Sequence, residues 1–466
     1  MAGDDIDTKQ DAGPYDEAFA EPGVPREQYA ALMQALEGRS VGALGREVAD
    51  AAAERGVTFG EDAGAFLIDP VPRVLTIEEW RDLEAGLGQR VRALAAFVTD
   101  VYGPRRIVAE GVVPARVIES AAYYEPALAG SAPARPVAIA GLDVVRDRDG
   151  RFRVLEDNVR TPSGIAYAVA ARELMEARLP APPGGVRGID DAFALLARAL
   201  HAAAPDGPRR DSALVILSDG PENTAWWEHC AIAERLRVPL VELADLDVAG
   251  DGLYARVDGR PQRVDVVYRR TNEDRLIGSD GRPTSIGSVL HEPWRRGQVG
   301  LVNAFGAGVA DDKLAHAYVE EMIRFYLGQE PIVRSVHTYD LCDPEVLEDV
   351  LGRVDDLVIK PRDGSGGHGV LVGPHAQDDD RAATAEELRS RPEGYVAQEM
   401  IRLSRHPTVV DDRLEPRHVD LRAFVFLAGE DAAVLPGGLT RVALDAGALV
   451  VSSSQNGGAK DTWVLA

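Results

Sequence analysis

The chain has 466 residues, 45% of them hydrophobic and 27% charged, which is ordinary for a globular protein and predicts two or three domains with sizeable cores. Its net charge of −25 argues against nucleic acid as a partner, because proteins bind phosphate backbones through basic surface. Two cysteines, Cys230 and Cys342, are too few for a disulfide framework or a zinc site, and no apolar run is long enough to span a membrane, so we expect a cytoplasmic protein.

The first 130 residues carry no motif to which we assign chemistry. Residues 1–25 are rich in Asp, Glu, Gly and Pro and predict a loosely ordered acidic arm. Residues 26–130 are predicted to be mainly helical, with clear apolar spacing from Ile77 to Tyr102. Gln89 and Arg90 could contact a ligand, although a solvated helix face is the favoured explanation.

Two apolar runs, residues 137–145 and 151–158, flank a strong turn signal at residues 147–150. They predict an antiparallel β-hairpin. With an even-numbered loop, Asp143 pairs with Val154, whereas a three-residue loop would turn one strand over.

In the even-numbered register, side-chain alternation places Asp143, Glu156 and Asn158 on one face beside apolar residues. Carboxylates against an apolar wall are unfavourable to bury without a cation, so the pattern favours a Mg²⁺ site with oxygen ligands. A salt-bridged surface hairpin stays open as the alternative. Arg160 follows directly, in a hydroxyl-bearing loop where a substrate carboxylate could bind.

Strand, helix and strand follow one another at residues 213–217, 222–237 and 239–243, which predicts an α/β unit. Arg269 and Arg270 end a later strand of this region. They could face an anionic ligand or form a surface pair.

The most informative stretch runs from Val358 to Val372, where two short β-branched runs flank Gly364, Gly366, Gly367 and Gly369. Backbone N–H groups of such a loop can converge on an anion. The spacing matches the dinucleotide fingerprint, but a strand follows where that fingerprint needs a helix, and the P-loop lysine is missing as well. A flap over a triphosphate and an ordinary flexible hairpin are the remaining interpretations.

Lysine is scarce in this chain, since only Lys9, Lys313, Lys360 and Lys460 contribute to the 51 basic residues. A compact ammonium group suits a phosphate oxygen in a tight pocket. The scarcity of lysine therefore favours the flap over a triphosphate. The alternative is that these few lysines were retained by chance. Lys313 lies in the first turn of a predicted helix that runs to about Leu327.

In their order along the chain, these motifs resemble a known family. Asp143 followed by Glu156-x-Asn158, two separated lysines and a glycine flap is similar to the ATP-grasp ligases, although here the metal motif precedes the lysines. That order, together with residues 264–270, 311–313, 437–441 and 460–463, looks like the circularly permuted ATP-grasp type 2 family, whose fold is similar to that of glutathionylspermidine synthetase. The likeness covers roughly residues 55 to 466.

The resemblance implies an α/β (α+β) fold: a circularly permuted ATP-grasp with a helical N-terminal part, a Rossmann-like pre-ATP-grasp unit and a glycine-flap nucleotide lobe. The expected divisions are an arm at 1–25, a helical region at 26–130, the metal hairpin and substrate loop at 131–205, the pre-ATP-grasp unit at 206–300 and the nucleotide lobe at 301–466.

The resemblance also implies roles for single residues. Asp143, Glu156 and Asn158 would bind Mg²⁺. Lys313 and Lys360 would hold the ATP phosphates beneath the flap residues Gly364, Ser365, Gly366, Gly367, His368 and Gly369. Gln398 and Glu399 would line the adenine and ribose pocket. Arg422 would face the γ-phosphoryl group, Arg160 the substrate carboxylate, and Arg441 and Lys460 are weaker candidates for the same basic cluster.

By resemblance, the expected activity is ATP-dependent, ADP-forming ligation of a carboxylate to an amine through an acyl phosphate, with small-molecule or peptide substrates. A kinase that stops at a phosphorylated product and a nucleotide-binding scaffold or sensor are the alternatives. Asp157 and Glu399 are guesses for the general base. The sequence leaves open the identity of the acid and the amine and the oligomeric state, with a homo-oligomer as one option.

Overall fold

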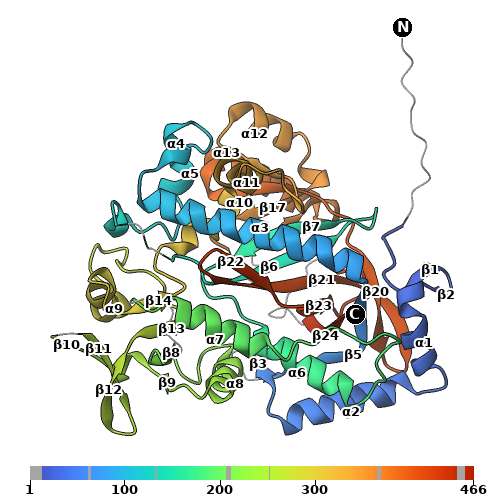
Figure 1. Cartoon of the computed structure of the whole chain (residues 1–466). Coiled ribbons are helices and arrows are strands. Elements are labelled where there is room, and N and C mark those ends of the chain that lie inside the picture. Colours follow the sequence, from blue (N-terminus) through green and yellow to red (C-terminus); the bar gives the residue numbers. More distant parts are fainter. Residues whose placement is uncertain are drawn as a thin grey trace.

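The computed structural model describes residues 13–60, 64–131, 133, 135–205, 211–250, 252–364, 369–448 and 457–466. The described residues form a mixed α/β fold, as predicted, in which helices cover a large central sheet and two smaller units adjoin it (Figure 1).

The central sheet has nine strands among the described residues. Its order is β15 (Arg334–Ser335), β7 (Phe152–Asn158), β6 (Ile139–Arg146), β21 (Arg413–Ala428), β23 (Leu439–Ala443), β24 (Gly457–Val464) and β5 (Ile68–Leu75), with β20 (Arg405–Val410) and β22 (Asp431–Val434) also paired to β21. Neighbouring strands come from distant parts of the sequence, and β24 runs parallel to β5. The sheet therefore places the last strand of the chain, β24, beside β5, which precedes all the other strands of the sheet in sequence.

A helix of 26 residues, α3 (Ile77–Tyr102), crosses one face of this sheet (Figure 1). It begins with a capping box in which Thr76 and Glu79 bond each other's backbone N–H groups. The expectation that Gln89 and Arg90 lie on a solvated face of this helix is wrong. Their exposed fractions are 2% and 0%, because α3 is buried on several sides.

The remaining helices and short strands surround the sheet. In chain order they are β1 (Phe19–Glu21), β2 (Val24–Pro25), α1 (Ala30–Leu36), α2 (Val41–Glu54), β3 (Thr58–Phe59), β4 (Gly64–Ala65), α4 (Arg106–Ala109), α5 (Ala115–Glu119), α6 (Ile165–Glu176), α10 (Lys313–His316) and α11 (Val319–Leu327). No helix in the described part of the chain has both the length and the apolar character needed to cross a bilayer.

A small sheet of four strands lies above the central sheet in the view of Figure 1. Its order is β16 (Thr338–Asp340), β19 (Tyr395–Glu399), β17 (Leu357–Pro361) and β18 (Leu371–Val372), and it packs with α12 (Pro344–Leu351) and α13 (Asp378–Ser390) around a separate apolar core. β17 and β18 are the two strands predicted to flank the glycine loop, and they pair antiparallel. Of that loop, residues 365–368 lie outside the described residues.

The predicted α/β unit is present. Four parallel strands run in the order β14 (Gly300–Val302), β13 (Val266–Arg270), β8 (Leu214–Ser218) and β9 (Leu240–Val241), accompanied by α7 (Ala192–Ala202), α8 (Trp226–Leu236) and α9 (Ser285–Arg295). An antiparallel sheet of β10 (Leu246–Ala249), β11 (Gly252–Val257) and β12 (Arg260–Val264) extends from it. The boundaries of the expected domains stay a prediction.

The hairpin predicted around residues 147–150 forms, but its register differs from the expected one. Asp143 lies opposite Glu156, not Val154. Leu155 is an extra, unpaired residue in β7, which is a β-bulge. Because of the bulge, Val154 turns into the main core with Val144, while Asp143 and Glu156 stay together.

The length of the hairpin loop explains why the observed register differs from the expected one. The last paired residues of the hairpin are Arg146 and Phe152, so the loop has an odd number of residues and not the even number that we expected. The bulge compensates for this shift and keeps the acidic side chains of both strands on one side.

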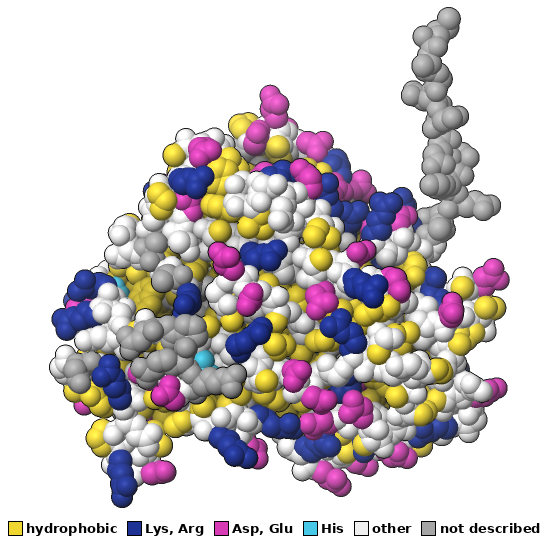
Figure 2. All heavy atoms as spheres, viewed as in Figure 1, with side chains coloured by type: hydrophobic (Ala, Val, Ile, Leu, Met, Phe, Trp, Pro, Cys, Tyr) yellow, Lys and Arg dark blue, Asp and Glu magenta, His cyan; other side chains and the backbone are white. Residues whose placement is uncertain are grey.

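Acidic and basic side chains are intermingled over the face shown in Figure 2.

The N-terminal segment, residues 13–25, is part of the fold. Residues 1–12 lie outside the described residues, but the expectation of a loose arm is wrong for residues 13–25. Glu17 is fully buried, accepts hydrogen bonds from Arg73 at 2.5 Å and the Ser404 hydroxyl at 2.6 Å, and forms an ion pair with Arg146 at 3.2 Å. Composition suggested disorder here because it could not show that Glu17 has two buried guanidinium partners.

We expect Glu17→Gln to destabilise the protein by about 3–5 kcal/mol, because it leaves the buried Arg73 guanidinium group without its carboxylate and Arg146 with Glu79 as its remaining acidic partner. Urea unfolding followed by circular dichroism measures the loss. Glu21→Gln, an exposed substitution in the same segment, is the matched control and should change stability by less than about 0.5 kcal/mol. Equal stability of the two variants would contradict a stabilising role for the buried pair.

The contribution of Glu17 should also depend on pH. Burial raises its pKa, but Arg146 and Arg73 outweigh burial and lower the pKa from 4.5 to about 2. A depressed carboxyl pKa stabilises the folded state above the unfolded pKa, and this stabilisation is lost as pH falls through the folded value. The stability difference between the wild type and Glu17→Gln should therefore be constant above about pH 4.5 and shrink towards pH 2.

Candidate functional site

A cavity of about 380 Å³ lies between the central sheet, the small sheet and α6. Its volume is in the range of small-molecule sites. The predicted site residues that line it are Asp143, Glu156, Asn158, Arg160, Lys313, Lys360, Gly364, Gln398, Glu399, Arg422 and Arg441. The structure thus brings together groups that are separated by up to about 300 positions in the sequence.

Three oxygen-bearing side chains meet on the β6–β7 hairpin. Asp143 and Glu156 are directly opposed, and Asn158 lies two residues further along β7. The amide nitrogen of Asn158 is buried with no hydrogen-bond partner among the described residues. Glu156 keeps 32% of its side chain exposed and its Oε1 lies 3.8 Å from the Lys313 ammonium group.

This donor set fits a hard divalent cation. The described residues contain no cluster of three or more His, Cys, Asp or Glu side chains that could hold a metal ion by itself. Mg²⁺ is usually bound by one or two carboxylates together with waters and phosphate oxygens. Two carboxylates and one amide oxygen therefore suit Mg²⁺ better than a metal that needs a complete protein cage.

Arginines neutralise Asp143 in this structure. Arg422 on β21 bonds both its carboxylate oxygens, at 2.5 and 2.9 Å, and Arg441 on β23 lies 2.9 Å away and also pairs with Asp420. Burial raises the pKa of Asp143, but these two guanidinium groups lower it to about 2. The Asp143 carboxylate is therefore ionised at neutral pH.

Two lysines face the acidic hairpin. The Lys313 ammonium group donates to the backbone oxygen of Gly364 and lies 3.4 Å from that of Arg362. Lys360 on β17 has its pKa lowered by burial and by Lys313, against an opposing effect of Glu156. The lysines and the metal-ligand candidates thus line one cavity. The predicted helix from Lys313 to Leu327 is divided in two, because α10 ends at His316 and α11 begins at Val319.

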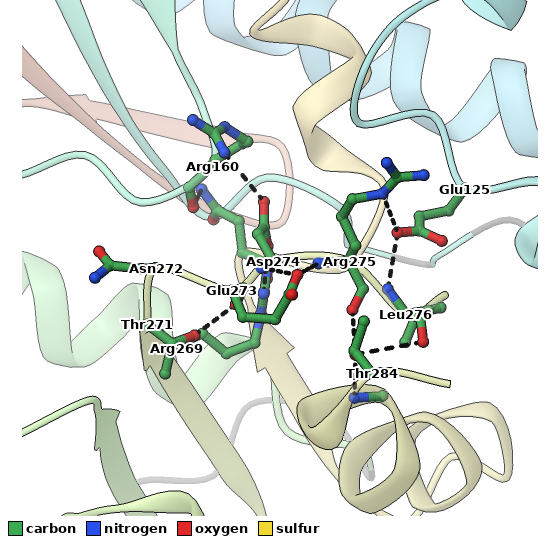
Figure 3. A network of polar contacts seen from close by, with 12 residues as sticks. Glu125, Arg160, Arg269, Thr271, Asn272, Glu273, Asp274, Arg275, Leu276 and Thr284 are labelled. Atoms are coloured by element: carbon green, nitrogen blue, oxygen red, sulfur yellow. Dashed lines mark hydrogen bonds and ion pairs between the residues drawn. The ribbon is translucent and has the colours of Figure 1, made fainter. Parts of the chain in front are cut away.

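Arg160 is held in a fixed orientation at the cavity wall. Its guanidinium group stacks on the Tyr123 ring at 3.7 Å and its Nε lies 3.0 Å from Asp311. Its Nη1 lies 3.9 Å from Asp274, which also pairs with Arg269 (Figure 3). Asp311 also accepts hydrogen bonds from the backbone N–H groups of residues 159 and 160.

The stacking of Arg160 on Tyr123 depends on the glycine beside them, Gly308. A side chain on Gly308 would start 2.5 Å from Tyr123 and 2.7 Å from Arg160, so only glycine leaves room for the two to stack. The sequence analysis included Asp311 only within the motif at residues 311–313, and it gave no signal for Tyr123.

The arginine pair at the end of β13 does not face the cavity. Arg269 is buried and bonds Asp274 and the Asn303 carbonyl. Arg270 is buried and bonds Glu228, the Pro162 carbonyl and the Ser163 hydroxyl. Neither the anion-facing nor the surface interpretation holds, since both arginines support the backbone around the site.

At the β19 end, Gln398 donates to the Thr338 hydroxyl at 3.0 Å. Glu399 accepts from the Tyr339 hydroxyl at 2.5 Å and from Arg353 at 2.7 Å, and these partners lower its pKa against the effect of burial. Of the six flap residues, Gly364 and Gly369 are described. Ser365, Gly366, Gly367 and His368 lie outside the described residues.

Two expectations need correction. Lys460 does not line the cavity: it is fully buried and bonds Asp69 and the Pro407 carbonyl at 3.1 Å, so it cannot reach a phosphate there. Asp157, a guess for the general base, accepts two hydrogen bonds from Arg90 and one from His316. Although burial raises the pKa of Asp157, Arg90 outweighs that effect and holds the pKa well below its usual value, which leaves a poor base.

Comparison with known proteins gives a consistent result. The family model described as circularly permuted ATP-grasp type 2 matches residues 72–443. A protein named "Putative glutamate--cysteine ligase 2-3" from Frankia alni is 46% identical over 98% of this chain and 54% of its own length, so the chain spans about half of that relative. An uncharacterized protein of Synechocystis sp. is 43% identical over 97% of both chains.

A solved structure extends the comparison to the fold. A glutathione synthetase-like effector from Globodera pallida aligns with a TM-score of 0.56 over 91% of this chain and 96% of that chain, at 11% identity. At that identity the likeness concerns the fold alone, and it agrees with the predicted fold class.

We expect Asp157→Asn to destabilise the protein by about 3–5 kcal/mol, because the Arg90 charge would stay buried without its carboxylate. Urea unfolding measures this loss. Asp149→Asn, at the exposed tip of the same hairpin, is the matched control. If Asp157→Asn unfolds at the same urea concentration as the control, the buried pair does not hold the hairpin in place.

Proposed function

The chain belongs to the circularly permuted ATP-grasp type 2 family, and from this premise we propose that it is an ATP-dependent ligase that joins a carboxylate to an amine and releases ADP. One observation carries the proposal: Lys313 and Lys360 share a cavity with the oxygen donors of Asp143, Glu156 and Asn158. That arrangement suits a nucleotide triphosphate with its Mg²⁺ ion.

In this proposal, ATP binds with its base towards the β19 end of the cavity. An apolar group of lining residues at that end would contact adenine: Val145, Leu155, Val358, Met400 and Leu403. Gln398 and Glu399 lie in the same wall and would contact the base and the ribose. The two ammonium groups would hold the phosphates, and Lys313 is already oriented towards Gly364 at the start of the flap.

Glu156, Asn158 and Asp143 would hold Mg²⁺. When bound, the ion supplies positive charge to the phosphate oxygens. Arg422 bonds the Asp143 carboxylate and lies beside this donor set, so it would stabilise the charge that develops on the transferring phosphoryl group. Arg160, fixed between Tyr123 and Asp311, would orient the substrate carboxylate.

The proposed reaction has two steps. A carboxylate oxygen attacks the γ-phosphorus and ADP leaves, which gives an acyl phosphate. An amine nitrogen then attacks the acyl carbon, phosphate leaves, and the nitrogen loses a proton to form the amide. The residues of this chain contribute alignment, charge stabilisation and exclusion of water, which would otherwise hydrolyse the acyl phosphate.

Glutamate and cysteine are the first substrate pair to test, because two Frankia relatives carry glutamate–cysteine ligase in their names. The chain spans only about half of each of these relatives, so their names give no assignment for this chain.

Both cysteines are free thiols, which supports a reducing, cytoplasmic location.

We expect Lys360→Ala and Glu156→Ala each to lower ADP release by at least about 100-fold while the protein stays folded, because each removes a charge that faces the triphosphate or its metal ion. The assay couples ADP formation to pooled amino acids, peptides and polyamines, followed by mass spectrometry of the product. Circular dichroism monitors folding.

Glu345→Ala, an exposed glutamate on α12 outside the cavity, is the matched control and should keep wild-type activity. Full activity in Lys360→Ala or Glu156→Ala would contradict the site. A phosphorylated product without a new amide would contradict ligation and indicate a kinase, and nucleotide binding without turnover would indicate a sensor.

A further inference from the structure

Part of the cavity wall is aromatic, and we call this part the aromatic end. Its wall continues from Arg422 through Ser163 and Gly164 to Phe59, Phe66 and Tyr167. The rings contact one another: their centroids are 4.4 Å apart for Phe66 and Tyr167, 5.8 Å for Phe59 and Tyr167, and 6.2 Å for Phe59 and Phe66. Leu439 adds an aliphatic contact from β23.

The N–H groups at the start of α6 are bonded within the protein. The first N–H groups of α6, from Gly164 and Ala166, donate to Glu228 at 2.8 and 3.1 Å. Glu228 also pairs with Arg270 at 2.9 Å, so the two buried charges neutralise each other. The helix N-terminus, a common anion site, is therefore occupied by a protein carboxylate.

The hydroxyl groups of the lining are also engaged. The Tyr167 hydroxyl donates to the Thr58 carbonyl at 2.8 Å, and the Ser163 hydroxyl accepts from Arg270 at 2.5 Å. Among the described lining residues of this end, a ligand can thus contact the half-buried Phe59 ring and the small accessible parts of Phe66 and Tyr167, which are 5% and 1% exposed. A charged side chain placed here would lose its hydration without gaining a partner, whereas an apolar one gains by leaving water.

We propose that the aromatic end binds an aromatic or bulky aliphatic side chain carried by one of the two ligated substrates. The inference rests on the proposed ligase function and adds a substrate class to it. The reacting groups would lie near Arg160 and Arg422, and the apolar side chain would extend past Ser163 to the three rings. Glutamate and lysine side chains are a poor match for this end.

A tryptophan beside the rings offers a direct signal. The Trp227 ring on α8 lies 4.9 Å from the Tyr167 ring, so a ligand packed on Tyr167 should change its fluorescence. Trp227→Phe removes this reporter and identifies which of the five tryptophans responds.

The experiment titrates the full chain, in the presence of ATP and Mg²⁺, with L-phenylalanine, L-leucine, L-glutamate and L-lysine, followed by tryptophan fluorescence and calorimetry. We expect the two apolar amino acids to bind at least about tenfold tighter than the two charged ones. Phe59→Ser should weaken phenylalanine binding by about tenfold or more, and Phe59→Leu should restore it to within a few fold. Affinity for ATP should be unchanged in both variants.

Phe19→Ser, which removes a half-buried ring on β1 outside the cavity, is the matched control for the loss of a phenylalanine. Tighter binding of glutamate or lysine, an unchanged phenylalanine affinity in Phe59→Ser, or binding of neither apolar amino acid would overturn the proposal. Failure of the ligase function itself is distinguished by the ADP-release assay with mass spectrometry, where the wild type would then form no amide, whereas the titration reads amino acid binding alone.

Discussion

The buried contact between Arg90, Asp157 and His316 is the constraint on which the geometry of the site depends. Asp157 lies between Glu156 and Asn158 in β7, and both its oxygens bond Arg90 of the long helix α3. It also bonds His316, which lies three residues after Lys313 in α10. One carboxylate therefore connects the strand of the metal-ligand candidates to the helix that presents a lysine.

Ion pairs with neighbouring carboxylates also explain how a chain with a net charge of −25 can hold several cationic side chains together in one cavity. Three basic side chains of the cavity illustrate this: Asp311 lies beside Arg160, Glu156 beside Lys313, and Asp143 and Asp420 beside Arg441. These contacts fix the direction of the cationic groups and offset their mutual repulsion. A small cluster is thus organised within an acidic protein.

The sequence predicted the parts of the site that short-range patterns encode. The β6–β7 hairpin, the strands beside the glycine loop and the α/β unit follow from apolar patterning and turn residues. Lysine scarcity pointed equally to Lys360 and Lys460, but it could not show that Asp69, 391 positions earlier in the chain, holds Lys460 in the core. The bulge at Leu155 and the burial of Glu17 likewise depend on contacts between distant segments.

The aromatic end is built from two parts of the chain. One part lies within the residues that the family model matches, and the other lies before them. Phe59 and Phe66 belong to the β3–β4 region and precede residue 72, where the family match begins, whereas the charged residues of the cavity lie within it. A substitution on this hairpin therefore leaves the charged residues of the cavity unchanged. The shape of the aromatic wall and the charge of the rest of the cavity are thus set by separate parts of the chain.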